Sequence, residues 1–295
     1  MNLKEISASF SKLDQIDSTA NQLQLIGTKL KWSGLVGSSR SLCASAVIQQ
    51  TPGNHIFILD DKEQAAYFLN DLEGIHAENP NVLFYPASYR VPYELEKTDN
   101  ANVVARAEVL ERISKGNNTW IVTYPQALFE KIPSEKNLVK STLKVEAGKS
   151  YSIDFINETL LEVGFDRVDF VYEPGQFSIR GGIIDVFSFA NDHPYRIEFF
   201  GDDVESIRTF DASTQLSVNR HQYFNIVPNI QGKLIQEGNV SIFDFLGENV
   251  TIWISSVELT KSSIDQEYKK AVTIYNGLET VTNPTIPANL FLHPT

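Results

Sequence analysis

The chain opens with a helical pattern and continues with alternating strand-like and helix-like segments. Residues 1–30 carry apolar side chains at steps of three or four, which predicts mostly helical structure. Three short, almost wholly apolar runs follow, of the kind that forms strands buried on both faces of a parallel sheet: 55–60, 81–85 and 119–123. Helical patterns stand before and between them at 42–49, 62–72 and 101–113. This order predicts an α/β domain with a parallel sheet.

The pattern changes after about Pro133. Short β-rich runs separated by Gly, Pro, Asn and Asp are then interrupted by one helical segment, 152–163. These runs span 138–146, 177–179, 182–189, 195–200 and 204–210. Gly201-Asp202-Asp203 between two of them is a hairpin signal. We therefore expect a separate α+β domain with an antiparallel sheet.

The α/β pattern returns after Pro228, with an apolar strand at 250–254 and a helix at 263–276. The simplest interpretation is an insertion into a discontinuous α/β domain. The expected division is 1–133 for the first α/β part, 134–228 for the inserted domain and 229–295 for the return. The last residues, 286–295, are typical of a loop that enters another element, so we expect a fragment of a longer protein; a natural C-terminus in an extended segment is the alternative.

Composition excludes several classes of site. The net charge is −12, which argues against a duplex-binding surface, because such surfaces are usually basic. Cys43 is the single cysteine, so no intramolecular disulfide and no cysteine-based zinc site is expected. The five histidines are scattered without metal-ligand spacing, and no run of about 18 apolar residues indicates a membrane span. We expect a cytoplasmic protein.

A degenerate phosphate loop lies at 34–41. A working loop has the pattern G-x-x-x-x-G-K-[ST]. In that frame Gly34 is the first glycine and Ser41 the magnesium-binding hydroxyl, with Gly37 between them. Ser39 stands at the second glycine and Arg40 at the lysine, and neither replacement is equivalent. We expect a structural relic, with residual nucleotide binding as the alternative.

The acidic partner of such a loop is also missing. A motor needs a strand that ends in Asp-Glu to hold magnesium, and the candidate strand at 252–258 has Ser255 and Ser256 there. No catalytic residue, metal or cofactor is therefore expected in this chain.

Two long strings in the β-rich part resemble a known family. Residues 173–187 follow the pattern Glu-Pro-Gly-x-Phe-x-x-Arg-Gly-Gly-x-x-Asp-Val-Phe, and residues 196–208 follow Arg-Ile-Glu-Phe-Phe-Gly-Asp-x-Val-Glu-Ser-Ile-Arg. Both strings resemble the inserted second domain shared by UvrB and the UvrB-like N-terminal part of the transcription-repair coupling factors (Mfd). Two features of UvrB are missing here, and both losses favour the second family. The phosphate loop of this chain is degenerate, and residues 84–101 leave no room for the hairpin with which UvrB clamps DNA. The resemblance implies a degenerate helicase-like framework around the insert.

The candidate binding surface lies on strand 195–200. Alternation puts Arg196, Glu198 and Phe200 on one face, and Ile197 and Phe199 on the other. Arginine with an aromatic residue on an exposed sheet is typical of interface hot spots, whereas a solvated face with weak ion pairs is the alternative.

The resemblance implies that this surface binds UvrA. When the family's UvrA contacts are transferred to the matching positions of this sequence, the expected contact residues are Arg180, Arg196 and Phe200. Glu198 and Arg208 are expected to be their neighbours. Gly181 and Gly182 are expected to shape the turn, and Asp185, Val186 and Phe187 to serve the fold.

The family also implies a longer parent. Its separate ATP- and Mg-dependent translocase would contact DNA and displace stalled RNA polymerase, and its C-terminal region would mask the UvrA-binding surface at rest. Alternatives for this chain are an active ATPase lobe and a UvrB-like DNA-binding module.

Overall fold

The computed structural model describes residues 3–76, 81–88, 91–93, 100–116, 118–137, 143–189, 193–226, 239–278 and 285–293. The predicted strand at 138–142, the boundary at 228 and most of the segment 89–99 lie outside these residues. The domain boundaries therefore stay predictions.

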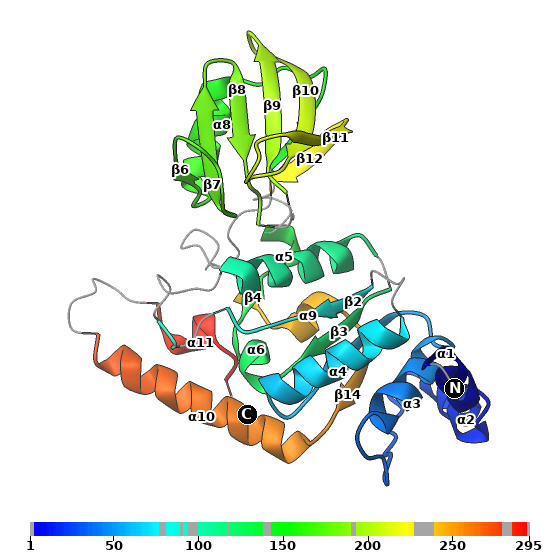
Figure 1. Ribbon diagram of the computed structural model, residues 1–295. Helices are drawn as coiled ribbons and strands as arrows, with labels where there is room; N and C mark the ends of the chain where they lie inside the picture. Colours follow the sequence, from blue (N-terminus) through cyan, green and yellow to red (C-terminus); the bar gives the residue numbers. More distant parts are fainter. Residues whose placement is uncertain are drawn as a thin grey trace.

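A four-stranded parallel sheet forms the first part of the molecule (Figure 1). Its order is β14-β1-β3-β2, and each adjacent pair runs parallel. The strands are β1 (Asn54–Ile58), β2 (Val82–Phe84), β3 (Trp120–Thr123) and β14 (Val250–Ile254). Because β14 pairs with β1 along its full length, the sheet joins segments from both sides of the β-rich part. The parallel sheet is confirmed, whereas its helicase-like ancestry stays a prediction.

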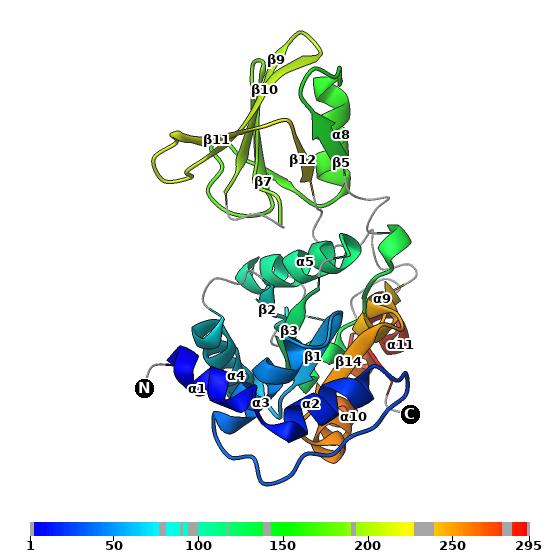
Figure 2. The ribbon, with the colours of Figure 1, turned by 90° about the vertical axis from the view of Figure 1, so that its right-hand side faces the viewer.

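Helices cover this sheet, as Figures 1 and 2 show. Those that precede the β-rich part are α1 (Leu3–Phe10), α2 (Asp14–Leu23), α3 (Ser39–Ile48), α4 (Lys62–Ile75), α5 (Asn100–Ser114) and α6 (Pro125–Phe129). Those that follow it are α9 (Ile242–Leu246), α10 (Val257–Asn276) and α11 (Pro287–Leu290). Strand β4 (Ile132–Pro133) pairs with β13 (Asn239–Val240) where the chain leaves and returns.

The start of α10 differs from the prediction. The strand predicted at 250–254 is confirmed by β14, but the helix predicted from residue 263 begins at Val257, so the stretch 255–258 that was compared with a motor strand lies beyond β14. The Ser256 hydroxyl accepts a hydrogen bond from the Leu259 amide and so caps the helix. The serines at the expected acidic positions thus end the strand and start the helix.

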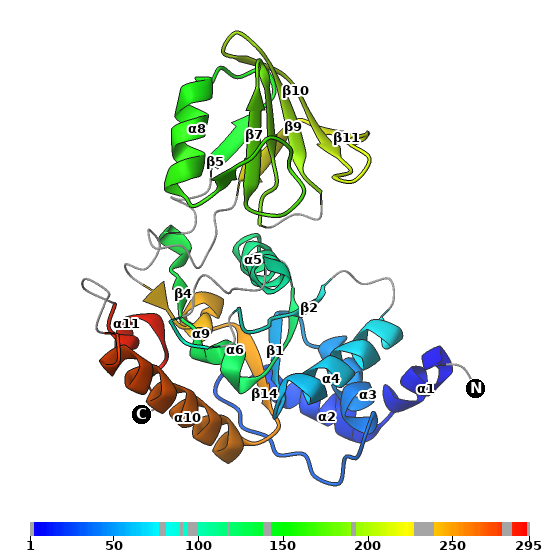
Figure 3. The ribbon, with the colours of Figure 1, turned by 60° about the vertical axis from the view of Figure 1, so that its left-hand side comes forward.

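The β-rich part forms a separate six-stranded sheet of order β11-β10-β9-β8-β7-β6 (Figure 3). Its strands are β6 (Asp166–Arg167), β7 (Gln176–Arg180), β8 (Ile183–Val186), β9 (Tyr195–Phe200), β10 (Asp203–Phe210) and β11 (Ser217–His221). The expected antiparallel pairing holds from β7 to β11, but β6 and β7 run parallel, so the sheet is mixed. A small pair, β5 (Leu143–Glu146) with β12 (Tyr223–Ile226), stands beside it.

Alternation along the strands decides which face of the six-stranded sheet is core. Ile184, Ile197 and Ile207 are paired across β8, β9 and β10 and are fully buried. Helix α8 (Ile153–Glu162) contributes Ile156 and Leu160 to the same core. The opposite face, called the outer face below, carries polar side chains together with Phe210, which belongs to a small separate cluster with Val171 and Phe187.

None of the described helices is long and apolar enough to cross a membrane.

Candidate protein-docking site

Strand β9 supplies the centre of the outer face. Tyr195, Ile197 and Phe199 point to the core and are buried. Arg196 and Glu198 are half-buried on the other side, and the ring of Phe200 at the end of the strand is 76% exposed. The predicted division of β9 into an apolar and a polar face is therefore confirmed.

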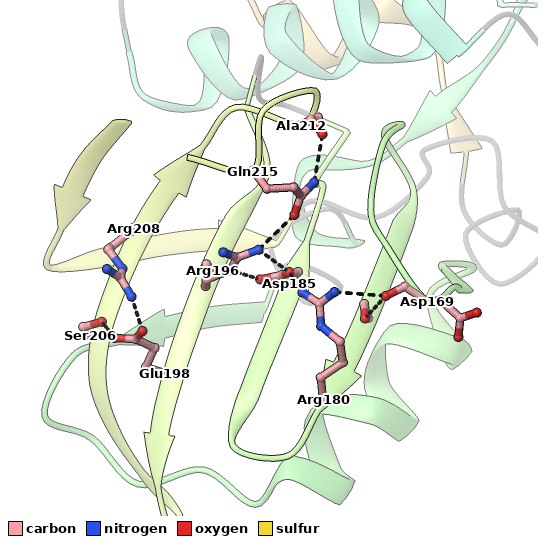
Figure 4. Close-up of polar contacts among 10 residues, drawn as sticks. Asp169, Arg180, Asp185, Arg196, Glu198, Ser206, Arg208, Ala212 and Gln215 are labelled. Carbon is pink, nitrogen blue, oxygen red and sulfur yellow. Dashed lines mark hydrogen bonds and ion pairs between the residues drawn. The ribbon is translucent and has the colours of Figure 1, made fainter. Parts of the chain in front are cut away.

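A buried carboxylate organises the arginines of the outer face (Figure 4). The side chain of Asp185 is only 1% exposed, and it faces Arg196 across the β8–β9 pair. Arg196 donates from Nε to Oδ1 at 2.7 Å and from Nη2 to Oδ2 at 2.8 Å. Arg180 donates from Nη2 to the same Oδ2. This hydrogen bonding raises the pKa of Arg196 above its usual value. Asp185 thus orients two cations as well as serving the fold.

The segment before β7 completes the surroundings of Arg180. Its Nη1 donates to the carbonyl oxygen of Asp169 at 3.2 Å, and its guanidinium lies over the ring of Phe170, with Cζ 4.7 Å from the ring centroid. The ring of Phe170 is 51% exposed. Sequence reasoning missed both residues, because their approach depends on how a loop packs rather than on strand alternation.

A turn at residues 211–215 holds Arg196 from the other side. Gln215 adopts a positive φ of 60° and accepts a hydrogen bond from Arg196 Nη2 at 3.1 Å. Asp211 stabilises the turn by accepting from the Ser213 hydroxyl and from Thr214, and these bonds lower the pKa of Asp211 to about 2. Arg196 also packs over Phe210, with Cζ 4.4 Å from the ring centroid.

Glu198 forms a second ionic group beside the first. It accepts from Arg208 through Oε1 and from the Ser206 hydroxyl through Oε2 at 2.5 Å. The buried Nε of Arg208 has no hydrogen-bond partner among the described residues. The five predicted contact residues therefore share one face: Arg180 and Arg196 belong to one ionic group, Arg208 and Glu198 belong to a second, and Phe200 stands at the end of β9.

The two glycines after Arg180 shape the hairpin between β7 and β8. Gly181 has φ of 60°, a conformation that side-chain-bearing residues rarely adopt. A Cβ on Gly182 would lie 2.8 Å from the carbonyl oxygen of Phe199. Gly181 is therefore needed for the turn, and Gly182 for the close approach of the hairpin to β9.

The segment that resembles a phosphate loop is closed by its own side chains. Gly34 and Gly37 have positive φ values of 82° and 56°. The Ser39 hydroxyl donates to the Val36 carbonyl at 2.8 Å and accepts from the Val36 amide at 2.9 Å.

The magnesium-binding position of the loop is also engaged. The buried Ser41 hydroxyl lies 2.6 Å from Asp71 Oδ2, to which it donates, while Arg40 is exposed. Residues 24–38, all described, contain no strand. Within the described part of the chain, no group of three or more His, Cys, Asp or Glu residues is arranged to hold a metal ion.

Comparison with known proteins gives two findings. Residues 143–231 match the sequence family described as UvrB interaction domain. The chain is 32% identical over 196 residues to the transcription-repair-coupling factor of Bacillus subtilis, which covers 66% of this chain and 17% of that protein. It is 29% identical over 210 residues to the factor of Myxococcus xanthus, covering 68% of this chain and 17% of that protein.

A further relative is the factor of Rickettsia typhi, 32% identical over 167 residues, covering 56% of this chain and 15% of the relative. The chain therefore spans about one sixth of the length of the curated relatives it matches. These findings confirm the resemblance expected from the sequence: residues 143–231 match the UvrB interaction domain family, and the chain is similar to part of the transcription-repair-coupling factors.

Proposed function

We propose that the outer face of the six-stranded sheet binds the nucleotide-excision-repair protein UvrA. The observation that carries this proposal is the arrangement of Arg180 and Arg196 on one buried carboxylate, Asp185 (Figure 4). Strand alternation puts the exposed side chain of Phe200 on the same face. The match of residues 143–231 to a UvrB interaction domain supports the same location.

The physical case rests on preorganisation. A guanidinium that is already fixed by hydrogen bonds loses less conformational entropy when it binds a partner. Arginine and large aromatic side chains supply most interface hot spots. A ring 76% exposed at the end of a strand gains apolar burial only when a partner covers it. The outer face offers both kinds of group together.

We further propose that this chain performs no nucleotide chemistry. The Ser39 and Ser41 hydroxyls are used within the protein, and Arg40 stands where a phosphate loop has lysine. In the proposed parent, ATP, magnesium, DNA and RNA polymerase are bound by other regions, and the C-terminal region masks the outer face at rest. This chain would then recruit the excision machinery to the stalled polymerase.

The proposal is tested by UvrA binding to the 295-residue chain. We expect Phe200→Ala to weaken binding by about tenfold, because truncation of an aromatic hot spot costs roughly 1–2 kcal/mol. Because the side chain of Phe200 is exposed, the substitution should leave the fold intact, and circular dichroism checks this. Arg180→Glu and Arg196→Glu should weaken binding at least as much.

Arg40→Glu is the matched control, since it reverses an exposed arginine on α3, outside the six-stranded sheet. It should bind like the wild type. Absence of binding by the wild-type chain would refute the proposed function. Unchanged affinity of all three outer-face variants would place UvrA binding elsewhere on the chain.

A further inference from the structure

Three arginines stand side by side across the outer face. The strand register pairs Asp185 with Arg196, Arg196 with Arg208, and Arg208 with Arg220, so that one row crosses β8, β9, β10 and β11. Like charges directly opposite one another on neighbouring strands destabilise a sheet. A row of three therefore needs negative charge close by.

The carboxylates on this face do not balance the row. Both oxygens of Asp185 are occupied by Arg180 and Arg196. Both oxygens of Glu198 are occupied by Arg208 and Ser206. Arg220 is exposed and forms no ion pair with any described residue. Four arginines thus share two carboxylates, in a chain whose net charge is −12.

The edge of the sheet at β11 also has an irregular backbone. The register of β10 with β11 shifts between Arg208 and Phe210, which is a β-bulge or similar irregularity immediately beside the Arg208–Arg220 pair. Irregularities of this kind at sheet edges often redirect a side chain toward a binding site. Leu216 and Val218, at the same edge, are 69% and 49% exposed. The edge therefore presents cationic and apolar groups together.

We propose that Arg220 is a further contact residue of the docking surface, and that it binds a carboxylate of an acidic protein partner. The proposal rests on the proposed function, because it extends the same surface across the β11 edge. Arg208 and Arg220 lie directly opposite one another on neighbouring strands, whose backbones are about 4.8 Å apart, so one partner segment can reach both arginines.

The test uses UvrA as the protein partner, and the 295-residue chain as the wild type and in four variants. We expect Arg220→Glu to raise the Kd at least tenfold and Arg220→Lys to raise it less, since lysine keeps the charge but loses the planar donor pair. Binding by Arg220→Glu should also depend less on salt concentration. Phe200→Ala reports on the proposed function alone, and Arg40→Glu is the charge-reversal control.

The outcomes separate the two proposals. If Phe200→Ala weakens binding while Arg220→Glu binds like the wild type, the extension to β11 is wrong and the proposed function stands. If the wild-type chain does not bind UvrA, both fall. If duplex DNA binds the chain, and Arg220→Glu weakens DNA binding as much as it weakens UvrA binding, then the row of arginines binds phosphates. The proposal of an acidic protein partner is then wrong.

Discussion

At the scale of single residues, Asp185 links the stability of the inserted sheet to its surface chemistry. A carboxylate that is 1% exposed is costly unless its charge is compensated. One arginine would neutralise it, whereas the second leaves the ionic group with a net positive charge at the surface. The sequence correctly marked Asp185 as important for the fold. Its role as the anchor of both arginines depends on the β8–β9 register, which the sequence alone does not fix.

The variant Asp185→Asn tests this double role. We expect the free energy of unfolding to fall by about 1–3 kcal/mol, because two half-buried guanidinium groups lose their counter-charge. UvrA binding should also weaken, since Arg180 and Arg196 are no longer held in place. Urea denaturation and binding titrations measure the two effects. Asp202→Asn, in the exposed turn between β9 and β10, is the matched control, and an unchanged urea midpoint for Asp185→Asn would contradict the assignment.

At the scale of elements, the apolar strands and the amphipathic helices were predictable, and their ends were less so. Strand β14 begins and ends where its apolar run does, because the apolar character of the side chains sets both ends of the strand. Helix α10 starts six residues before the expected position, since a serine cap rather than an apolar stripe sets its start. The parallel β6–β7 pair was missed because two residues are too few to show a period.

A histidine joins the two halves of the parallel sheet and gives it a pH dependence. Trp253 Nε1 of β14 donates to His55 Nδ1 of β1 at 3.1 Å, and His55 Nε2 donates to the Thr51 carbonyl at 2.8 Å. The bond from Trp253 requires an unprotonated Nδ1 and therefore the neutral ring. Burial lowers the pKa of His55 below its usual value, although the bond to the Thr51 carbonyl acts in the opposite direction. The unfolded chain therefore binds the proton more readily than the folded one.

Stability should accordingly be complete above about pH 6.5 and should fall as the pH drops through the lower pKa of the folded state, by at most about 1.4 kcal/mol per pH unit for this one group. Urea denaturation between pH 8 and pH 5 measures the slope. Because burial also lowers the pKa of His76, the informative comparison is with His55→Gln, which should lose part of the slope. An equally steep profile in that variant would contradict the role of His55.

At the scale of the whole molecule, strand alternation predicted which residues share the outer face, but the extent of that face was not predictable. Arg196, Glu198 and Phe200 lie on one strand, so their common face follows from a period of two residues. Phe170 reaches the face from a loop, and Arg220 reaches it through an irregular pairing at the sheet edge. Contacts of this kind depend on the assembled sheet. The net charge of −12 likewise conceals a face on which arginines outnumber carboxylates.

The phosphate-loop segment at 34–41 lies outside the six-stranded sheet that carries the proposed docking residues, so its chemistry can be tested separately. We expect Ser39→Gly combined with Arg40→Lys, which restores the motif letters, to leave the chain unable to bind ATP. The motif needs a preceding strand and a free hydroxyl, whereas residues 24–38 form no strand and the Ser41 hydroxyl is held by Asp71.

Titration of a fluorescent ATP analogue in the presence of magnesium measures this, with an intact phosphate-loop ATPase as the positive control. The same double variant should bind UvrA like the wild type, because both substitutions lie at the start of α3 in the framework, whereas the docking residues belong to the inserted sheet. Saturable ATP binding by the wild type would refute the non-nucleotide assignment. Saturable binding by the double variant alone would show that Ser41 can leave Asp71 for a nucleotide, and that the framework kept the architecture of a motor after losing only two side chains.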